Sequence, residues 1–102
     1  MNSIFIYITN PNLKEAKKVA KHLLENKLIA CANIFPIESI YRWEGKIVQE
    51  KEYILLVKTT EEKYEKVKSE VEKVHSYEIP CIIKIPAEAN KKYLSWIKNE
   101  VE

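Results

Sequence analysis

The chain has 102 residues, of which 46% are apolar and 31% are charged, and its 17 basic and 15 acidic residues leave a net charge of +2. This length suits one domain, and the apolar fraction argues against intrinsic disorder. The near balance of charge argues against a nucleic-acid partner. No apolar run approaches the roughly 20 residues that a membrane span needs.

The charged residues are almost all Glu and Lys, because the chain has no Asp and only one Arg, Arg42. This composition is typical of thermophile proteins, and equally of A/T-rich genomes; the first interpretation predicts a thermostable protein. The start of the chain, Met1 to Ile4, lacks the basic region of a secretion signal, so we expect a cytoplasmic protein. The single glycine, Gly45, excludes glycine-rich phosphate loops.

The first half of the chain predicts a strand, a helix and a long hairpin. Residues 4–9 predict a strand buried on both faces, and Asn12 with Glu15 forms a capping box that starts a helix. Residues 28–41 predict a long strand with Pro36 at a bulge or a sheet edge, and residues 47–59 a second one after a turn at Gly45. The expected inward side chains of the helix are Leu13, Ala16, Ala20, Leu23, Leu24 and Leu28, and we expect His22 to be solvated.

The second half predicts a helix, a strand and a final helix. Thr59 with Glu62 suggests a second capping box, and the exposed face of the helix would pair Glu62 with Lys66 and Lys68 with Glu72. Residues 75–80 predict a loop, residues 81–85 a strand closed by Pro86, and Asn90 the cap of the last helix. The expected inward side chains are Tyr64, Val67, Val71 and Val74 in the first helix, and Tyr93, Leu94, Ile97 and Val101 in the second.

The predicted order is β-α-β-β-α-β with an extra C-terminal helix, which is the α+β, ferredoxin-like arrangement. Its four strands would form one antiparallel sheet with two helices on one face. We find no linker or internal repeat, so residues 1–102 are expected to form a single domain.

The central hairpin is longer than its own sheet requires. Its strands have roughly a dozen residues each, against the usual five or six. The tip carries apolar and aromatic side chains that would be exposed on a strand edge, among them Tyr41 and Trp43. Pairing with neighbouring copies of the chain would cover them; a bent, free-standing arm is the alternative.

Five ordered segments resemble the CutA divalent-cation tolerance family over nearly the whole chain. They are Leu28-Ile29-Ala30-Cys31-Ala32-Asn33-Ile34, Tyr41-Arg42-Trp43-Glu44-Gly45-Lys46, Leu56-Val57-Lys58-Thr59, His75-Ser76-Tyr77-Glu78-Ile79-Pro80 and Tyr93-Leu94-Ser95-Trp96. The resemblance implies a ferredoxin-like homotrimer whose hairpins pair between subunits, a role in tolerance of divalent ions, and copper binding. It implies no enzymatic activity. The alternative is a small-molecule-sensing or scaffold trimer of the P-II type with no physiological metal.

The resemblance places the family's copper ligands at positions where this chain differs. A first-strand cysteine is replaced by Ile8, and only His75 remains of two adjacent histidines, because Val74 occupies the other position; Ser76 stands where the family usually has proline. His75 and Cys31 are therefore the candidate metal ligands of this chain, since imidazole and thiolate suit copper. A loop histidine bonded to a carbonyl or carboxylate, and a buried cysteine, are the alternatives.

The candidate residues of an intersubunit cleft carry polar or aromatic groups. Glu52 and Lys58 lie on one face of an otherwise apolar strand, where they would line a polar cleft or form an interchain salt bridge. Trp43 could stack on a ligand, or pack between subunits. The remaining cleft candidates are Asn33 and Tyr77.

The sequence offers no catalytic constellation. A Ser/His/Asp arrangement is excluded because the chain has no Asp. A Cys31/His75 dyad would need an activated thiolate, yet Cys31 lies in an apolar strand. We therefore expect a protein that is not an enzyme.

Overall fold

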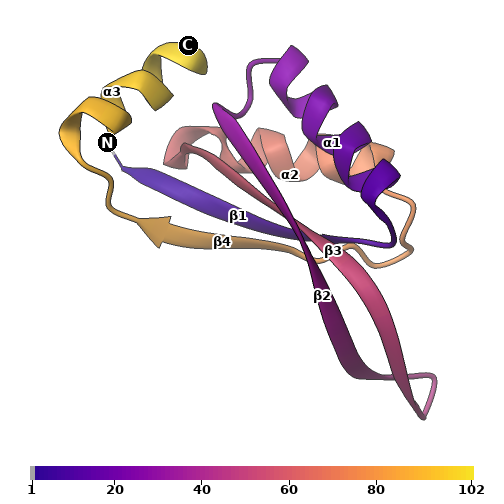
Figure 1. Cartoon of the computed structure of the whole chain (residues 1–102). Coiled ribbons are helices and arrows are strands. Elements are labelled where there is room, and N and C mark those ends of the chain that lie inside the picture. Colours follow the sequence, from indigo (N-terminus) through magenta and orange to yellow (C-terminus); the bar gives the residue numbers. More distant parts are fainter. Residues whose placement is uncertain (1) are drawn as a thin grey trace.

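A computed structural model describes residues 2–102 of the chain (Figure 1). None of the helices in this range is long and apolar enough to cross a membrane. The elements, in chain order, are β1 (Ser3–Asn10), α1 (Leu13–Glu25), β2 (Cys31–Trp43), β3 (Lys46–Thr60), a 3₁₀ turn (Glu61–Lys63), α2 (Tyr64–Val74), β4 (Ile82–Ala87) and α3 (Lys91–Glu100).

The four strands form one antiparallel sheet in the order β2-β3-β1-β4. Strand β1 is central: Ser3 pairs with Thr60 of β3 on one side and with Ala87 of β4 on the other. Helices α1 and α2 cover one face of the sheet (Figure 1). This is the predicted ferredoxin-like α+β fold with its extra C-terminal helix.

The core lies between the two helices and the sheet. Alternate residues of β1 point toward the helices and are buried. Phe5, Tyr7 and Thr9 point to the other face and are only half-buried, so the predicted burial on both faces is wrong for that face. Val19 is a buried core residue that the helical pattern missed. Leu13 and Leu24 are 40% and 42% exposed, so their predicted inward positions are wrong. The buried side chains of this core include Ile4, Ile6, Ile8, Val19, Leu23, Leu55, Val57, Val67 and Val71.

The hairpin of β2 and β3 extends beyond the rest of the sheet, as the strand lengths predicted (Figure 1). Strand β1 pairs with β3 only from Tyr53 to Thr60, so the pairs from Ile37–Glu52 to Trp43–Lys46 belong to the hairpin alone. Pro36 lies on β2, an edge strand, and its register continues without a bulge. We name residues 37–52 the hairpin arm.

The turn at the tip of the arm has two central residues, both with positive φ. Glu44 has φ 49° and Gly45 has φ 78°. Positive φ at both positions is typical of the type I′ turn, whose twist matches that of antiparallel strands. Glycine adopts this conformation without steric cost, which explains the position of the only glycine of the chain.

The two predicted capping boxes have different outcomes. The Asn12 side chain accepts a 2.8 Å hydrogen bond from the Glu15 amide, as expected at the start of α1. The second box is wrong, because the Thr59 hydroxyl donates to the Leu28 carbonyl (2.7 Å) and a 3₁₀ turn precedes α2. The predicted ion pairs of α2 are also wrong: the helix pairs Glu65 with Lys68 and Glu70 with Lys73.

The last strand and helix differ slightly from their predicted bounds. Pro86 lies within β4 and does not close it; β4 is an edge strand, where a residue without an amide hydrogen is tolerated. Asn90 precedes α3 as predicted, but its side chain makes no capping hydrogen bond. Helix α3 buries Ile97 and Val101 against Ala30.

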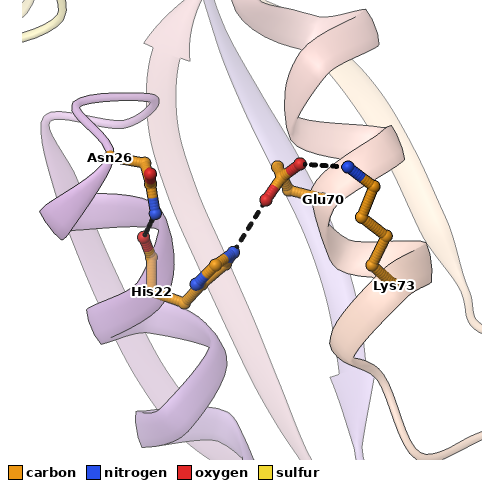
Figure 2. A network of polar contacts seen from close by, with 4 residues as sticks. All are labelled: His22, Asn26, Glu70 and Lys73. Atoms are coloured by element: carbon orange, nitrogen blue, oxygen red, sulfur yellow. Dashed lines mark hydrogen bonds and ion pairs between the residues drawn. The ribbon is translucent and has the colours of Figure 1, made fainter.

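A polar network joins the two large helices and corrects the expectation that His22 is merely solvated. The Nε2 atom of His22 on α1 lies 2.9 Å from a carboxylate oxygen of Glu70 on α2, and Lys73 binds the other oxygen at 2.9 Å (Figure 2). Asn26 contacts the His22 carbonyl in the same network (Figure 2). The helices are thus connected by a polar contact as well as by apolar packing.

Candidate functional site

A groove of about 590 Å³ lies where the hairpin arm meets the loop before β4. Its wall comes from β1, from both strands of the arm and from residues 75–81, so segments far apart in the sequence build it. The lining residues are Thr9, Ser39, Ile40, Tyr41, Trp43, Glu50, Glu52, Tyr77, Glu78, Ile79 and Cys81.

Glu52 and Tyr77 form the central polar contact of this groove. The Tyr77 hydroxyl donates a 2.6 Å hydrogen bond to Oε2 of Glu52, which is only 6% exposed. Burial, followed by this hydrogen bond to the carboxylate, raises the pKa of Tyr77 well above its usual range. Tyr77 therefore stays a protonated donor at neutral pH.

A second tyrosine–glutamate pair lies further along the arm. The Tyr41 hydroxyl donates a 2.5 Å hydrogen bond to Oε1 of Glu50. This hydrogen bond is the main cause that raises the pKa of Tyr41 to about 12. The groove thus holds two carboxylates, each bonded by a phenol.

The groove has an acidic wall. Glu50, Glu52 and Glu78 line it, whereas no Lys, Arg or His of the described residues does. Burial, and then the charge of Glu52, raises the pKa of the Cys81 thiol. The electrostatic environment therefore favours cations over anions.

His75 lies beside this groove with both ring nitrogens engaged. The Tyr77 amide donates a 3.0 Å hydrogen bond to Nδ1, so the proton resides on Nε2, which donates to the Thr9 carbonyl at 2.7 Å. This is the loop histidine bonded to a carbonyl that the sequence left as an alternative. A metal ion on His75 would have to displace one of these two hydrogen bonds.

Cys31, the other candidate metal ligand, lies elsewhere on the sheet. It pairs with Lys58 on β3, whereas Thr9, the partner of His75, pairs with Ile54. One chain therefore does not bring Cys31 and His75 together. Among residues 2–102, no three His, Cys, Asp or Glu side chains gather in a way that could hold a metal ion.

The five predicted cleft residues fall into two groups. Trp43, Glu52 and Tyr77 line the groove. Lys58 shares a strand face with Glu52 but lies in a smaller cavity of about 140 Å³ beside α3, where its ammonium is 5.5 Å from the Tyr93 ring centroid. Asn33 is exposed and pairs with Leu56, outside the groove.

Several groove residues were missed by sequence reasoning. Glu50 stands two residues from Glu52 and shares its strand face, and this alternation could have identified it. Thr9, Glu78 and Cys81 belong to other segments, so only the folded chain places them here.

The fold and the groove together define a ferredoxin-like protein with an overhanging hairpin and an acidic groove at the base of that hairpin. A family model described as CutA1 divalent ion tolerance protein matches residues 4–100. The chain belongs to this family.

Individual relatives agree with this assignment. The chain is 54% identical over 99 residues to the divalent-cation tolerance protein CutA of Archaeoglobus fulgidus, covering 96% of this chain and 97% of the relative. It is 44% identical over 95 residues to the protein of the same name from Thermus thermophilus, covering 91% and 92%. The structure of the periplasmic divalent cation tolerance protein CutA from Archaeoglobus fulgidus superposes with a TM-score of 0.95 at 52% identity, covering 98% of this chain and 99% of that one.

Proposed function

We propose that this protein is a homotrimer that binds a divalent metal, copper among the candidates, at a cleft between subunits and so contributes to divalent-cation tolerance. The observation that carries the proposal is the acidic groove at the base of the hairpin arm, lined by three carboxylates and by no basic side chain of the described residues. The family of the chain and the names of its relatives support the tolerance role.

The trimer is supported by the apolar surface that one chain leaves exposed. Ile40 and Ile47 on the arm are 69% and 67% exposed, and Phe35, Ile83 and Ile85 are exposed on the sheet face opposite the helices. Strand pairing between arms of neighbouring copies would satisfy free strand edges and cover this surface.

Light scattering after size exclusion tests the oligomer. We expect a mass three times the 12.0 kDa of the chain. A mass equal to one chain would contradict the pairing of the arms, and two chains would contradict the trimer.

The described residues of one chain do not provide a complete set of metal ligands. We therefore place the ion where subunits meet. The carboxylates of Glu50, Glu52 and Glu78 offer oxygen ligands, and His75 and Cys31 remain the candidate nitrogen and sulfur ligands that suit copper. A neighbouring copy would supply the donors that one chain lacks.

Calorimetric titration with Cu²⁺ tests the metal. We expect binding by the wild type that weakens in His75→Ala and Cys31→Ala, with Ser76→Ala as a neutral loop control. Equal binding by all variants would remove both residues from the site, and no binding by the wild type would contradict the metal. Circular dichroism of each variant verifies that it is folded.

The proposal assigns no catalysis to the groove. Histidine and lysine are common activating bases for a nucleophile, and neither lines the groove among the described residues. The thiol of Cys81 has a raised pKa, the opposite of an activated cysteine. We therefore expect Cys81 to react slowly with iodoacetamide at neutral pH; rapid, stoichiometric alkylation of Cys81 would contradict this.

A small-molecule-sensing trimer without a physiological metal is the second candidate. The groove volume of about 590 Å³ favours it, because this is the size of small-molecule pockets and far exceeds that of one ion. A chelator separates the two candidates. If the protein binds a metal, removal of the metal would abolish the stabilisation that the ligand gives to the fold. If the protein binds a small molecule without a metal, that stabilisation would be unchanged.

We also propose a cytoplasmic location and high thermal stability. The two cysteines, Cys31 and Cys81, are free thiols, as expected in a reducing compartment. Fractionation of the source cells tests the location, and recovery with secreted or membrane fractions would contradict it. Calorimetry tests the stability: we expect melting above about 60 °C, beyond the mesophile range.

A further inference from the structure

Glu52 is a buried carboxylate without a cationic partner among residues 2–102. It is 6% exposed, and its recorded hydrogen bond comes from the neutral hydroxyl of Tyr77. The ion pairs among residues 2–102 involve Glu61, Glu65 and Glu70, and none of them involves Glu52. Burying an ionised carboxylate is costly unless a positive charge compensates it. Within the described residues, Glu52 therefore has no positive charge to compensate it. Because Glu52 lines a groove, a ligand could supply that charge.

The wall around Glu52 is aromatic and apolar. Tyr41, Trp43 and Tyr77 contribute rings, and Ile40 and Ile79 contribute aliphatic surface. Aromatic rings attract organic cations through their electron-rich faces, with tryptophan the strongest. Carboxylates beside aromatic rings suit a ligand that carries both a positive charge and a carbon chain.

The dimensions of the groove leave room for an organic cation. About 590 Å³ is the volume of a small-molecule site. The described residues provide no cluster of three His, Cys, Asp or Glu ligands. Two of the three carboxylates each accept one hydrogen bond from a phenol, so each keeps a second oxygen with which to meet a cation.

We propose that this groove binds a small alkylammonium ligand of the diamine class, with one ammonium on Glu52 and the carbon chain beside the Tyr77 and Tyr41 rings, whose hydroxyls bind Glu52 and Glu50. A second ammonium would reach Glu50 or Glu78 in the same wall. This inference rests on the small-molecule-sensing candidate above and names its ligand class.

Isothermal titration calorimetry of the purified oligomer tests the inference, with putrescine as the probe. We expect a saturable binding signal with putrescine and none with butanediol, which has the same carbon chain and no charge.

Two charge-removing variants separate the groove from general electrostatics. In Glu52→Gln, which keeps an oxygen acceptor for Tyr77, we expect putrescine to bind about tenfold or more weakly. In Glu38→Gln, an exposed residue that does not line the groove, the affinity should stay within about twofold.

The outcomes are decisive for the ligand class. No saturable response to millimolar putrescine, an equal response to butanediol, or equal affinity in Glu52→Gln would each overturn the inference. The Cu²⁺ titration and the mass measurement are made on the same samples without putrescine. Failure of the metal or of the trimer can therefore be distinguished from failure of this inference.

Discussion

The Tyr77 hydroxyl lies 2.6 Å from Oε2 of Glu52, so the loop before β4 is bonded to the point where β3 leaves the main sheet. This contact closes one side of the groove and anchors the base of the hairpin arm. It also satisfies a carboxylate that the fold buries almost completely. The loop and the arm are therefore expected to respond together to changes at either residue.

Tyr77→Phe should destabilise the protein by about 1–3 kcal/mol, because it leaves the buried Glu52 carboxylate without its donor. Urea unfolding at a fixed protein concentration measures this, since the stability of an oligomer depends on concentration. Tyr53→Phe is the matched control: Tyr53 lies on the same strand as Glu52, and its hydroxyl has no hydrogen bond within residues 2–102. Equal losses in the two variants would contradict a specific role for the Tyr77 contact.

Leu23→Ala and Leu24→Ala should differ strongly, although the residues are neighbours on α1. Leu23 is 0% exposed, so its truncation leaves a cavity and should cost about 2–5 kcal/mol. Leu24 is on the outer side of the helix, and its truncation should change stability by less than about 1 kcal/mol. The midpoints of urea unfolding compare the two. A larger loss at Leu24 would mean that this side chain is covered in the assembled protein.

Gly45→Ala should destabilise the tip of the arm by about 1 kcal/mol, because alanine is strained at positive φ. A Cβ at this position would meet no atom within 4 Å, so the backbone alone causes the loss. Glu44→Asn should act in the opposite direction, since asparagine tolerates the φ of 49° better than glutamate. Differential scanning calorimetry measures both, and a neutral Gly45→Ala variant would rule out the type I′ turn.

The network of His22, Glu70 and Lys73 predicts a pH-dependent contribution to stability (Figure 2). Hydrogen bonds from Lys73 and then His22 lower the pKa of Glu70 below its ordinary value. The folded state therefore binds a proton less readily than the unfolded state, so the stabilisation is present above the ordinary glutamate pKa and is lost as the pH falls through the lowered value.

Melting curves of Glu70→Gln test this dependence. We expect a melting temperature lower than that of the wild type by about 1–3 °C at pH 7, and a difference close to zero at an acid pH below the lowered pKa of Glu70. Glu72→Gln is the control on the same helix, because Glu72 forms no ion pair among the described residues. A difference that is the same at both pH values would refute the linkage.

Much of the fold could be predicted because local patterns decide it. The apolar run of β1, the Asn12 cap and the turn at the single glycine each depend on residues close in the sequence. The excess length of the hairpin followed from strand lengths alone. The failures involve distant partners: the Thr59 hydroxyl binds the Leu28 carbonyl, and His22 binds Glu70, 48 residues away.

The groove was only partly predictable for the same reason. The sequence identified Glu52 as a charged residue on an apolar strand, and Trp43 and Tyr77 as aromatic cleft candidates. The fold brings all three to the groove. Lys58 has the same signature as Glu52 but lies at the other end of the strand face, near Tyr93. Sequence alternation tells on which face of a strand a residue lies. Where along that face the groove forms depends on how the loop of residues 75–80 packs.

The central position of β1 has a consequence for how the chain is made. Its two pairing partners are residues 53–60 and 82–87, so β1 leaves the ribosome before either of the strands that enclose it. Until β4 emerges, Ile4, Ile6 and Ile8 belong to an incomplete sheet with one open ladder. Closure of the sheet on both sides of β1 therefore has to wait for the segment 82–87 to be synthesised.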